Sequence, residues 1–369
     1  MTIDGISPNR VVRPESIEEL SRVIRDSQGS VIPLGSGTQQ EFGNPLRSAD
    51  TVVDLTRLNR VTSYNPADLT VHVEAGVTLG QLQRLLAENN QVLPLDPWNG
   101  PTATIGGIAA VNAQGPLRPT GSIRSWIIGM RIVHADGRIS KTGGRVVKNV
   151  TGYDLAKLYT GSLGTLAVIA EISLKLRSSY AKTATAIAEF ERVPDAIAMV
   201  RQIDDSPLQP ICCEVAGPNA AVWVRFGEHP RAVDWQVANL PTANWKVVEG
   251  DEEVSHWETF RERYQALGSV LVRTIATPST IGEVLDTFRP AAWIAHAANG
   301  IVLMTVSGPD EIRRVREKFP TVIERAPLDV RRQISTFGVR ATELRLMKEM
   351  KQALDPGGRL NPGRHADGE

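Results

Sequence analysis

The segment Thr151–Leu176, TGYDLAKLYTGSLGTLAVIAEISLKL, decides the fold of this chain. A turn that contains Gly161, Gly164 and Thr165 comes before an apolar run, which predicts a strand over residues 166–176. Glycine lets a backbone pass close to a flat or anionic group because it has no Cβ to clash. The same pattern also fits an ordinary hairpin, so its meaning depends on two further glycine-rich segments upstream.

The first of these segments is PLGSGT at residues 33–38, directly after a short apolar run. Consecutive small residues let successive N–H groups converge, and their partial positive charge suits a pyrophosphate. Gln40 stands where a Rossmann G-x-G-x-x-G motif needs glycine, and no Gly-Lys-Ser/Thr of a P-loop is present. A plain turn is the alternative interpretation.

The second segment is TATIGGIAAVNAQG at residues 102–115. It is almost devoid of bulk and charge, so it cannot form a free-standing amphipathic element. We expect it to press against a ligand or another backbone. A small-residue helix packed on a sheet is the alternative, but it explains Gly106, Gly107 and Gly115 poorly.

Length and charge limit the function classes. The 369 residues allow two or three domains, and 41 Lys+Arg balance 41 Asp+Glu, so nucleic acid is not an expected partner. No apolar stretch reaches the ~18 residues that a membrane span needs, and the first residues show no signal-peptide pattern. We therefore expect a cytoplasmic protein, with any association with the inner face of the membrane made through partners only.

The only two cysteines, Cys212 and Cys213, are adjacent. Neighbouring cysteines rarely bond to each other, and no C-x-x-C motif is present. The chain therefore cannot supply the thiolates of an iron–sulfur cluster or a structural zinc site. We expect no bound metal.

Hydrophobic periodicity predicts an α+β protein in three parts. Residues 1–177 form one domain, residues 178–330 a smaller antiparallel α/β cap, and residues 331–369 a segment that returns to the first domain. On the strand over 69–75, His72 and Glu74 are expected on the outward face. Helices are predicted over 11–26, 78–86, 194–203, 255–266, 281–289 and 340–354. Strands are predicted over 31–33, 51–55, 69–75, 126–134, 139–140, 166–176, 211–216, 221–226, 269–274 and 300–305.

Order and spacing of the three glycine-rich segments resemble the PCMH-type FAD-binding domain of the vanillyl-alcohol oxidase family. The phrases LPLDPWNGPTATIGGIAA, VVKNVTGYDLAKLYTGSLGTL and the tail LNPGR at 360–364 carry the resemblance. It is specific over roughly 10–177 and 355–364 and loose over 180–335. The resemblance implies a PCMH-type fold of two subdomains with FAD as cofactor.

The resemblance also implies which residues line the FAD. Many family members attach the flavin through a histidine in the first loop, but here the loop continues with Gln39 and Gln40, so the FAD is expected to be non-covalent. The implied residues are Pro33, Leu34, Gly35, Ser36, Gly37, Thr38 and Gln39 in the first loop, Thr104, Ile105, Gly106, Gly107, Asn112 and Gly115 in the second segment, Gly121, Ser122, Gly161, Gly164, Thr165 and Ile169 further on, and Asn361 in the tail.

Catalytic residues are not evident. Oxidation of a 2-hydroxy acid needs a cation for the carboxylate, a base for the hydroxyl proton and a flavin. Related dehydrogenases carry H-x-G-D-G-N-L-H, but the matching stretch here, HAANGIVL at 296–303, keeps only the first histidine. His296, Arg273 and Arg331 are weak candidates. Their plainer interpretations are a hydrogen-bonded histidine in a cap strand, a structural arginine, and a solvated Arg331-Arg332 pair.

The resemblance implies a flavoprotein subunit of a glycolate (2-hydroxy acid) dehydrogenase complex. Its partners would be a second flavin subunit, which holds the complete substrate site, and an iron–sulfur subunit, which removes electrons. One alternative is a self-sufficient FAD-dependent dehydrogenase of a hydroxy acid or sugar alcohol. The other is an architectural subunit with a vestigial flavin site.

Overall fold

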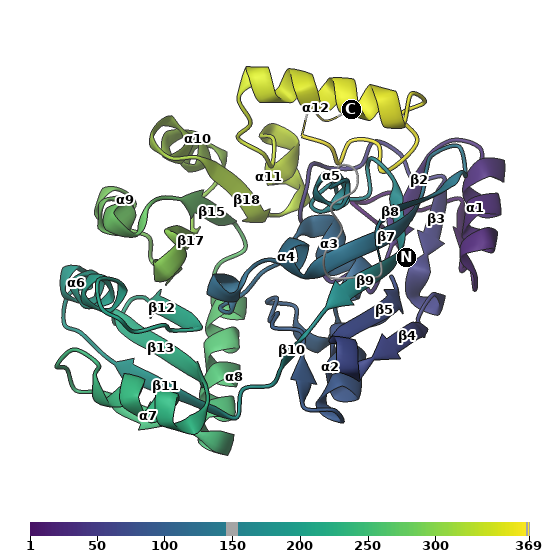
Figure 1. Ribbon diagram of the computed structural model, residues 1–369. Helices are drawn as coiled ribbons and strands as arrows, with labels where there is room; N and C mark the ends of the chain where they lie inside the picture. The colour runs from purple at the N-terminus through teal and green to yellow at the C-terminus, as the bar shows by residue number, and fades with distance from the viewer. Residues whose placement is uncertain (145–153, 367, 369) are drawn as a thin grey trace. The chain divides into compact units, whose positions relative to one another are not determined.

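The computed structural model describes residues 1–144, 154–366 and 368, and it divides into two compact units (Figure 1). The first unit contains Met1–Gln114, Gly121–Ser179 and Arg331–Glu369. The second contains Gly115–Thr120 and Tyr180–Val330. Both units combine helices with sheets, which confirms the predicted α+β class. The fold-deciding segment lies in the first unit, where its described part begins at residue 154.

A three-stranded parallel sheet forms one half of the first unit, in the order β1 (Arg10–Val12), β3 (Thr51–Asp54), β2 (Val31–Leu34). Parallel strands need a crossover, and α1 (Ile17–Asp26) supplies it between β1 and β2. The helix predicted over 11–26 is confirmed only from Ile17 onward, because residues 10–12 form β1, and its buried residues are Ile17, Leu20 and Ile24. They pack against Val31, Val53 and Val168 in one apolar core.

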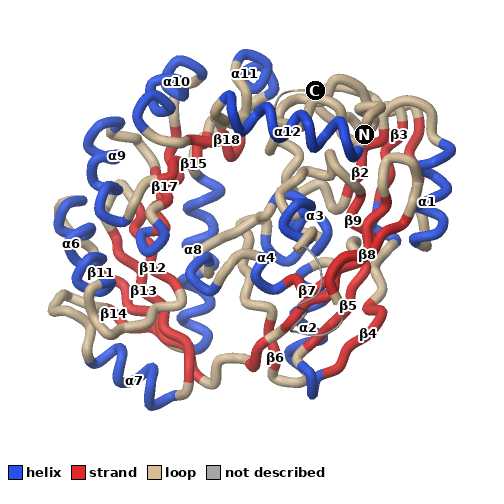
Figure 2. The backbone as a smooth tube through the Cα atoms, turned by 45° about the horizontal axis from the view of Figure 1, so that its top comes forward, coloured by secondary structure: helices blue, strands red, loops and turns tan. Residues whose placement is uncertain are grey.

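A five-stranded antiparallel sheet forms the other half, and Figure 2 shows its strands side by side. The apolar run of the fold-deciding segment forms β9, which lies at the centre of this sheet and pairs with strands on both sides. The strand order is β4 (Val61–Asn65), β5 (Thr70–Glu74), β9 (Val168–Lys175), β7 (Ile127–Val133), β8 (Ile139–Gly143). The strands predicted over 126–134 and 139–140 are confirmed as β7 and β8, which pair as a hairpin with Gly137 at φ +84° in the turn.

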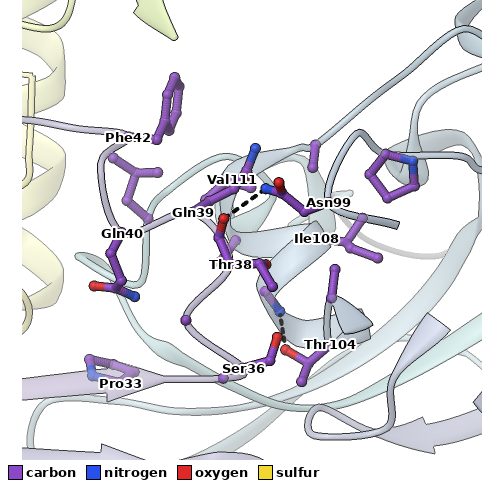
Figure 3. Close-up of a pocket in the computed structure, with 18 of the residues that line it drawn as sticks. Pro33, Ser36, Thr38, Gln39, Gln40, Phe42, Asn99, Thr104, Ile108 and Val111 are labelled. Carbon is purple, nitrogen blue, oxygen red and sulfur yellow. Dashed lines mark hydrogen bonds between the residues drawn. The ribbon is translucent and has the colours of Figure 1, made fainter. Parts of the chain in front are cut away.

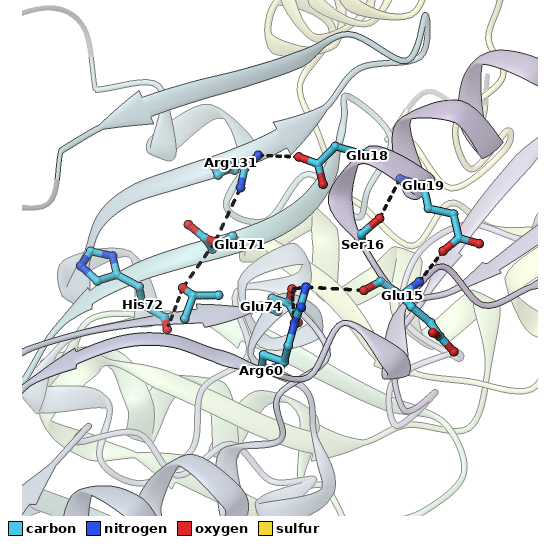
Figure 4. A network of polar contacts seen from close by, with 10 residues as sticks. Glu15, Ser16, Glu18, Glu19, Arg60, His72, Glu74, Arg131 and Glu171 are labelled. Atoms are coloured by element: carbon cyan, nitrogen blue, oxygen red, sulfur yellow. Dashed lines mark hydrogen bonds and ion pairs between the residues drawn. The ribbon is translucent and has the colours of Figure 1, made fainter.

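One face of this sheet carries a buried polar layer, so the expected outward position of His72 and Glu74 is wrong. Both side chains are buried, with residue exposures of 5% and 1%. Glu74 lies opposite Glu171 across the strand pair, and each carboxylate meets an arginine (Figure 4). Arg60 lies 2.7 Å from Glu74 and Arg131 lies 3.9 Å from Glu171. Strand alternation predicts which face a residue occupies, but not whether other elements cover that face.

The opposite face of the sheet packs on two helices, α2 (Leu79–Ala87) and α3 (Ile105–Val111). Thr78 caps α2, and with Gln81 it forms a capping box. The remaining elements of this unit are β6 (Gln91–Val92) paired with β10 (Arg177–Ser178), the short helices η1 (Leu55–Arg57), η2 (Pro66–Asp68), η3 (Gly100–Thr102), α4 (Ile123–Trp126) and α5 (Ala156–Tyr159), and α12 (Ala341–Leu354).

The second unit is built on an eight-stranded sheet whose neighbouring strands are all antiparallel. Its strand order is β14 (Lys246–Val248), β11 (Lys182–Ala188), β13 (Ala221–Glu228), β12 (Cys212–Ala216), β16 (Trp293–His296), β17 (Ile301–Thr305), β15 (Leu271–Ile275), β18 (Thr321–Arg325). Its helices are η4 (Arg118–Thr120), α6 (Val193–Asp204), α7 (Pro230–Ala238), α8 (Gly250–Ala266), η5 (Pro278–Thr280), α9 (Ile281–Phe288), η6 (Ala297–Asn299) and α10 (Pro309–Lys318), and α11 (Leu328–Gln333) contains the boundary to the first unit.

Aromatic side chains join α8 to this sheet. Trp223 of β13 lies 5.7 Å from Trp257 and 5.0 Å from Phe260, measured between ring centroids. These tryptophans therefore serve packing between the helix and the sheet.

Candidate cofactor-binding site

The three glycine-rich segments of the first unit meet at one pocket of about 730 Å³, open solvent included (Figure 3). The loop after β2 forms one wall and α3 forms a second. Further lining residues are Pro97, Asn99, Leu163, Asn361 and Arg364. A second pocket of about 420 Å³ shares Pro33, Gly35 and Thr104 with the first. The two pockets therefore adjoin at the contact between the first loop and α3. Together they are called the slot.

The first loop touches α3 so closely that Gly35 has no room for a side chain. A Cβ at this position would lie 2.3 Å from Thr104 Oγ1. The next glycine, Gly37, has a φ of +74°, in the left-handed region that glycine favours. The Asn99 Nδ2 group donates a hydrogen bond of 2.8 Å to the Thr38 carbonyl (Figure 3). The alternative of a plain turn does not account for these contacts.

The second segment forms α3, and both interpretations of it hold in part. A Cβ on Gly106 would lie 2.6 Å from the Cβ of Ala75, so this glycine allows a helix to pack directly on the backbone after β5. Gly107 lines the first pocket, and its backbone N–H donates to Thr104 Oγ1 at 3.2 Å. The segment is therefore a packed helix with one side turned to the slot.

The third segment is not a hairpin turn, because it follows the short helix α5 and contacts the end of α3. Backbone N–H groups of Gly161 and Leu163 donate to the carbonyls of Ala109 and Ala110, at 2.9 and 2.8 Å. Gly164 has a φ of +66°, and a Cβ there would lie 3.2 Å from Asn361 Nδ2. This glycine therefore allows the tail to approach the turn.

Unpartnered polar atoms in and beside the slot are what a flavin nucleotide would satisfy. Within the described residues, the side-chain oxygens of Asn112 and Asn361 are buried and accept no hydrogen bond. Asn361 lines the pocket while its Nδ2 donates to the Leu163 carbonyl at 2.6 Å. Buried acceptors in native proteins nearly always have a donor. FAD offers such donors in its ring N–H and its hydroxyl groups, so the residues fit this cofactor.

The structure brings most, but not all, of the predicted cofactor residues to the slot. Gly115 lies in the second unit, and Gly121 and Ser122 precede α4 away from the lining. Ile105 is part of the apolar core. Asn112, Gly161 and Thr165 are not among the lining residues either. Those that line the slot are Pro33, Leu34, Gly35, Ser36, Gly37, Thr38, Gln39, Thr104, Gly106, Gly107, Gly164, Ile169 and Asn361.

Several lining residues were not predicted. Asn99 and Arg364 lie in the quoted motifs DPWNG and LNPGR, so their polar side chains within glycine- and proline-rich stretches were an available signal. The remaining lining residues are Ile32, Gln40, Phe42, Leu55, Ala75, Pro97, Ala103, Ile108, Ala110, Val111, Ala113, Leu163 and Val168. Most of them are apolar, so in the sequence they look like core residues.

The tail is fixed to the slot by one buried lysine. Lys351 of α12 donates from Nζ to the Thr165 carbonyl at 2.8 Å, to the Leu360 carbonyl at 3.0 Å and to Asp355 Oδ2 at 2.5 Å. Its side chain is 6% exposed and that of Asp355 is 0% exposed. The Asn361 N–H then donates to the Val31 carbonyl of β2 at 3.0 Å. These contacts place Asn361 beside the first and third segments.

The three weak catalytic candidates are each engaged in ion pairs or hydrogen bonds. His296 Nδ1 lies 2.8 Å from Glu214 in the second unit, and its residue exposure is 1%, as expected for a hydrogen-bonded strand histidine. In the same unit, Arg273 lies 3.2 Å from Glu324. Arg331 is buried in the first unit, so the interpretation of a solvated pair is wrong for it.

Burial gives His296 a defined pH dependence. The pKa of His296 lies well below its ordinary value because the ring is buried, and because Arg118 and Arg273 add positive charge nearby. In the unfolded chain the ring titrates near ~6.5. Below that pH the unfolded state binds a proton that the folded state does not, so stability is lost as pH falls from ~6.5 toward the folded pKa.

We therefore expect the free energy of unfolding of the second unit to fall as the pH is lowered from 7 to 5. His296→Gln should reduce the slope of this free energy against pH by up to ~1.4 kcal/mol per pH unit. Urea denaturation at several pH values measures both slopes. His229→Gln, at an exposed position, is the matched control and should leave the slope unchanged. Equal slopes for wild type and His296→Gln would refute the assignment.

Two further properties of the described residues bear on function. Within residues 1–144, 154–366 and 368, no group of three or more His, Cys, Asp or Glu side chains is placed to hold a metal ion. In the same part of the chain, no helix combines the length and the apolar composition needed to cross a membrane.

The sheets, the slot and the tail define the first unit as a cofactor-binding domain of the kind found in FAD-linked oxidases. Residues 8–143 match the family model described as an FAD binding domain, and residues 332–365 match the C-terminal domain of FAD linked oxidases. The chain therefore contains an FAD-binding domain of the PCMH type and the C-terminal domain of FAD-linked oxidases, and the proteins that carry these domains bind FAD.

Known relatives include two glycolate oxidase subunits. GlcE of Escherichia coli is 28% identical over 94% of this chain and 95% of its own length. GlcD of Bacillus subtilis is 26% identical over 97% of this chain and 88% of its own length. A mitochondrial D-lactate dehydrogenase of Arabidopsis thaliana is 34% identical, but the match spans 51% of this chain and only 34% of that protein.

Solved structures agree on the fold. Alkyldihydroxyacetonephosphate synthase superposes over 95% of this chain and 75% of its own, with a TM-score of 0.69 and 15% identity. At this identity the likeness concerns the fold alone.

Proposed function

We propose that the chain is the FAD-binding subunit of a dehydrogenase complex that oxidises glycolate or a related 2-hydroxy acid. The observation that carries the proposal is the slot in the first unit, formed by three glycine-rich segments and the tail. Similarity along nearly the whole chain to glycolate oxidase subunits supports the substrate class.

The residues that would hold the cofactor are those of the slot. The small residues Gly35 and Gly37 expose backbone N–H groups that suit phosphate oxygens. Asn361 would accept a hydrogen bond from the flavin, since its side-chain oxygen lacks another donor among the described residues. FAD, when bound, supplies the acceptor for the hydride of the hydroxyl-bearing carbon. The protein contributes position and exclusion of water.

The proposal includes partner subunits because each catalytic candidate among the described residues is already held by a carboxylate. His296, Arg273 and Arg331 are engaged by Glu214, Glu324 and Asp4 respectively. The adjacent cysteines are buried, and burial raises the pKa of Cys213, so a thiolate at that position is disfavoured. Electrons from a reduced flavin would need another carrier. A second flavin subunit and an iron–sulfur subunit would supply the substrate site and that carrier.

Turnover by the isolated chain tests this function. Purified alone, it should bind FAD but reduce an artificial electron acceptor with glycolate or D-lactate at only background rates. Robust turnover without partners would contradict the proposal and favour a self-sufficient dehydrogenase. A preparation that takes up no FAD would instead favour an architectural subunit.

A further inference from the structure

The tail places a buried arginine in the wall of the slot. Arg364 lines the pocket together with Gln40 and Asn361, and only 5% of the residue is exposed. Its Nη1 group donates to the Asn44 carbonyl at 3.3 Å and its Nη2 group to Gln40 Oε1 at 3.4 Å. The guanidinium is therefore fixed to the loop that continues from the first glycine segment.

The carboxylate of Asp4, near the N-terminus, forms ion pairs with two arginines. Asp4 Oδ1 lies 2.6 Å from Arg331 Nη2, and Asp4 Oδ2 lies 3.1 Å from Arg364 Nη1. Asp4 Oδ2 also accepts the Leu46 N–H at 3.0 Å. A single negative charge that two guanidinium groups share can compensate at most one of them.

The pKa of Arg364 reflects this balance. Burial is the largest influence and lowers the pKa to about 10, although Asp4 raises it and Arg331 lowers it further. A lowered pKa means that the surroundings do not fully stabilise the charged form. A buried cation of this kind gains most from an anion placed next to it. The slot beside Arg364 is where such an anion would bind.

We propose that Arg364 is a cofactor-binding residue that presents its positive charge to an anionic part of the flavin nucleotide in the slot. The inference rests on the proposed function, because it requires FAD in this pocket. Two parts of the cofactor have this chemistry. They are the pyrophosphate, which is always anionic, and the isoalloxazine, which becomes anionic when reduced.

Arg364→Gln tests the proposal, with Arg364→Lys as the variant that keeps the charge. Binding of FAD and of riboflavin is measured by fluorescence titration, and the potential of bound flavin by anaerobic reduction. If the charge meets the pyrophosphate, Arg364→Gln should bind FAD about tenfold more weakly or worse, with riboflavin binding unchanged. If it meets the reduced ring, that variant should favour oxidised over reduced flavin by a further factor of about ten, which lowers the potential by ~30 mV.

Arg364→Lys should remain close to wild type in whichever property changes. Arg47→Gln, on the same loop and exposed, is the matched control and should change neither. If Arg364→Gln does not fold, Asp4→Asn/Arg364→Gln replaces it, since this pair leaves the summed charge of Asp4, Arg331 and Arg364 unchanged.

An unchanged FAD affinity and potential in the glutamine variant would overturn the inference. An equal loss of FAD and riboflavin binding at constant potential would also overturn it, because that pattern indicates a structural role. Failure of the wild-type chain to bind FAD would instead refute the proposed function.

Discussion

Lys351→Met is expected to lower the free energy of unfolding of the first unit by about 3–5 kcal/mol, because it leaves the carboxylate of Asp355 buried without its cation. The lysine uses all three ammonium donors, and two of them hold the carbonyls of Thr165 and Leu360. Methionine matches the length of the side chain but satisfies none of these groups. Urea denaturation followed by circular dichroism measures the loss.

The same change should weaken FAD binding, since it frees the segment that carries Asn361. Arg345→Met on the same helix is the matched control. Arg345 and Glu349 form an exposed pair, with side chains 84% and 62% exposed, and such pairs contribute at most ~0.5 kcal/mol. A stability loss in Lys351→Met no larger than that in the control would show that the lysine does not hold the tail.

Gly35→Ala should weaken FAD binding about tenfold or more, because the new Cβ would lie 2.3 Å from Thr104 Oγ1. Either the first loop moves away from α3, or Thr104 rotates and loses its bond to the N–H of Gly107. Both changes alter the slot at its narrowest contact. Fluorescence titration with FAD measures the effect, and Gly282→Ala, with no atom within 4 Å of the new Cβ, should bind FAD like the wild type.

A second substitution tests this cause. Thr104→Ala removes the hydroxyl and leaves the new Cβ of Gly35→Ala about 3.4 Å from the Thr104 Cβ, which is ordinary van der Waals contact. Alone it costs about 1 kcal/mol through the lost helix cap. The double variant should bind FAD more tightly than Gly35→Ala. If the losses of FAD affinity in the two single variants add up in the double variant, the clash with Thr104 does not explain why glycine is needed at position 35.

The part of the site that local sequence could predict is its glycine framework. Gly35, Gly107 and Gly164 line the slot because each allows a close approach that only a residue without a side chain permits. Those positions are visible as motifs within short segments. The helix α1 and the hairpin of β7 and β8 were equally predictable, since periodicity and turn residues are local properties.

The contacts that join distant segments could not be predicted in this way. Asp4 forms ion pairs with Arg331 and Arg364, which lie more than three hundred residues later in the sequence. In the sequence, Lys351 looks like another charged residue of an exposed helix, and only the fold shows that it is buried. Arg331 was misread for the same reason, because a pair of arginines in a polar stretch gives no sign of a buried partner.

The burial of a polar sheet face was the second feature that the sequence could not predict. The strand pattern placed His72 and Glu74 on the face opposite Val71 and Val73, but the layer that covers that face comes from other parts of the chain. Charged residues there are tolerated because arginines neutralise them. Alternation alone carries no information about such partners.

The flavin content of the purified chain tests the central claim most directly. After reconstitution with FAD and removal of unbound cofactor, the protein is denatured with acid, and flavin is measured in the supernatant and in the pellet. We expect one FAD per chain, all of it in the supernatant, and a much lower content for Gly35→Ala. No bound flavin, or flavin that stays with the denatured protein, would contradict it.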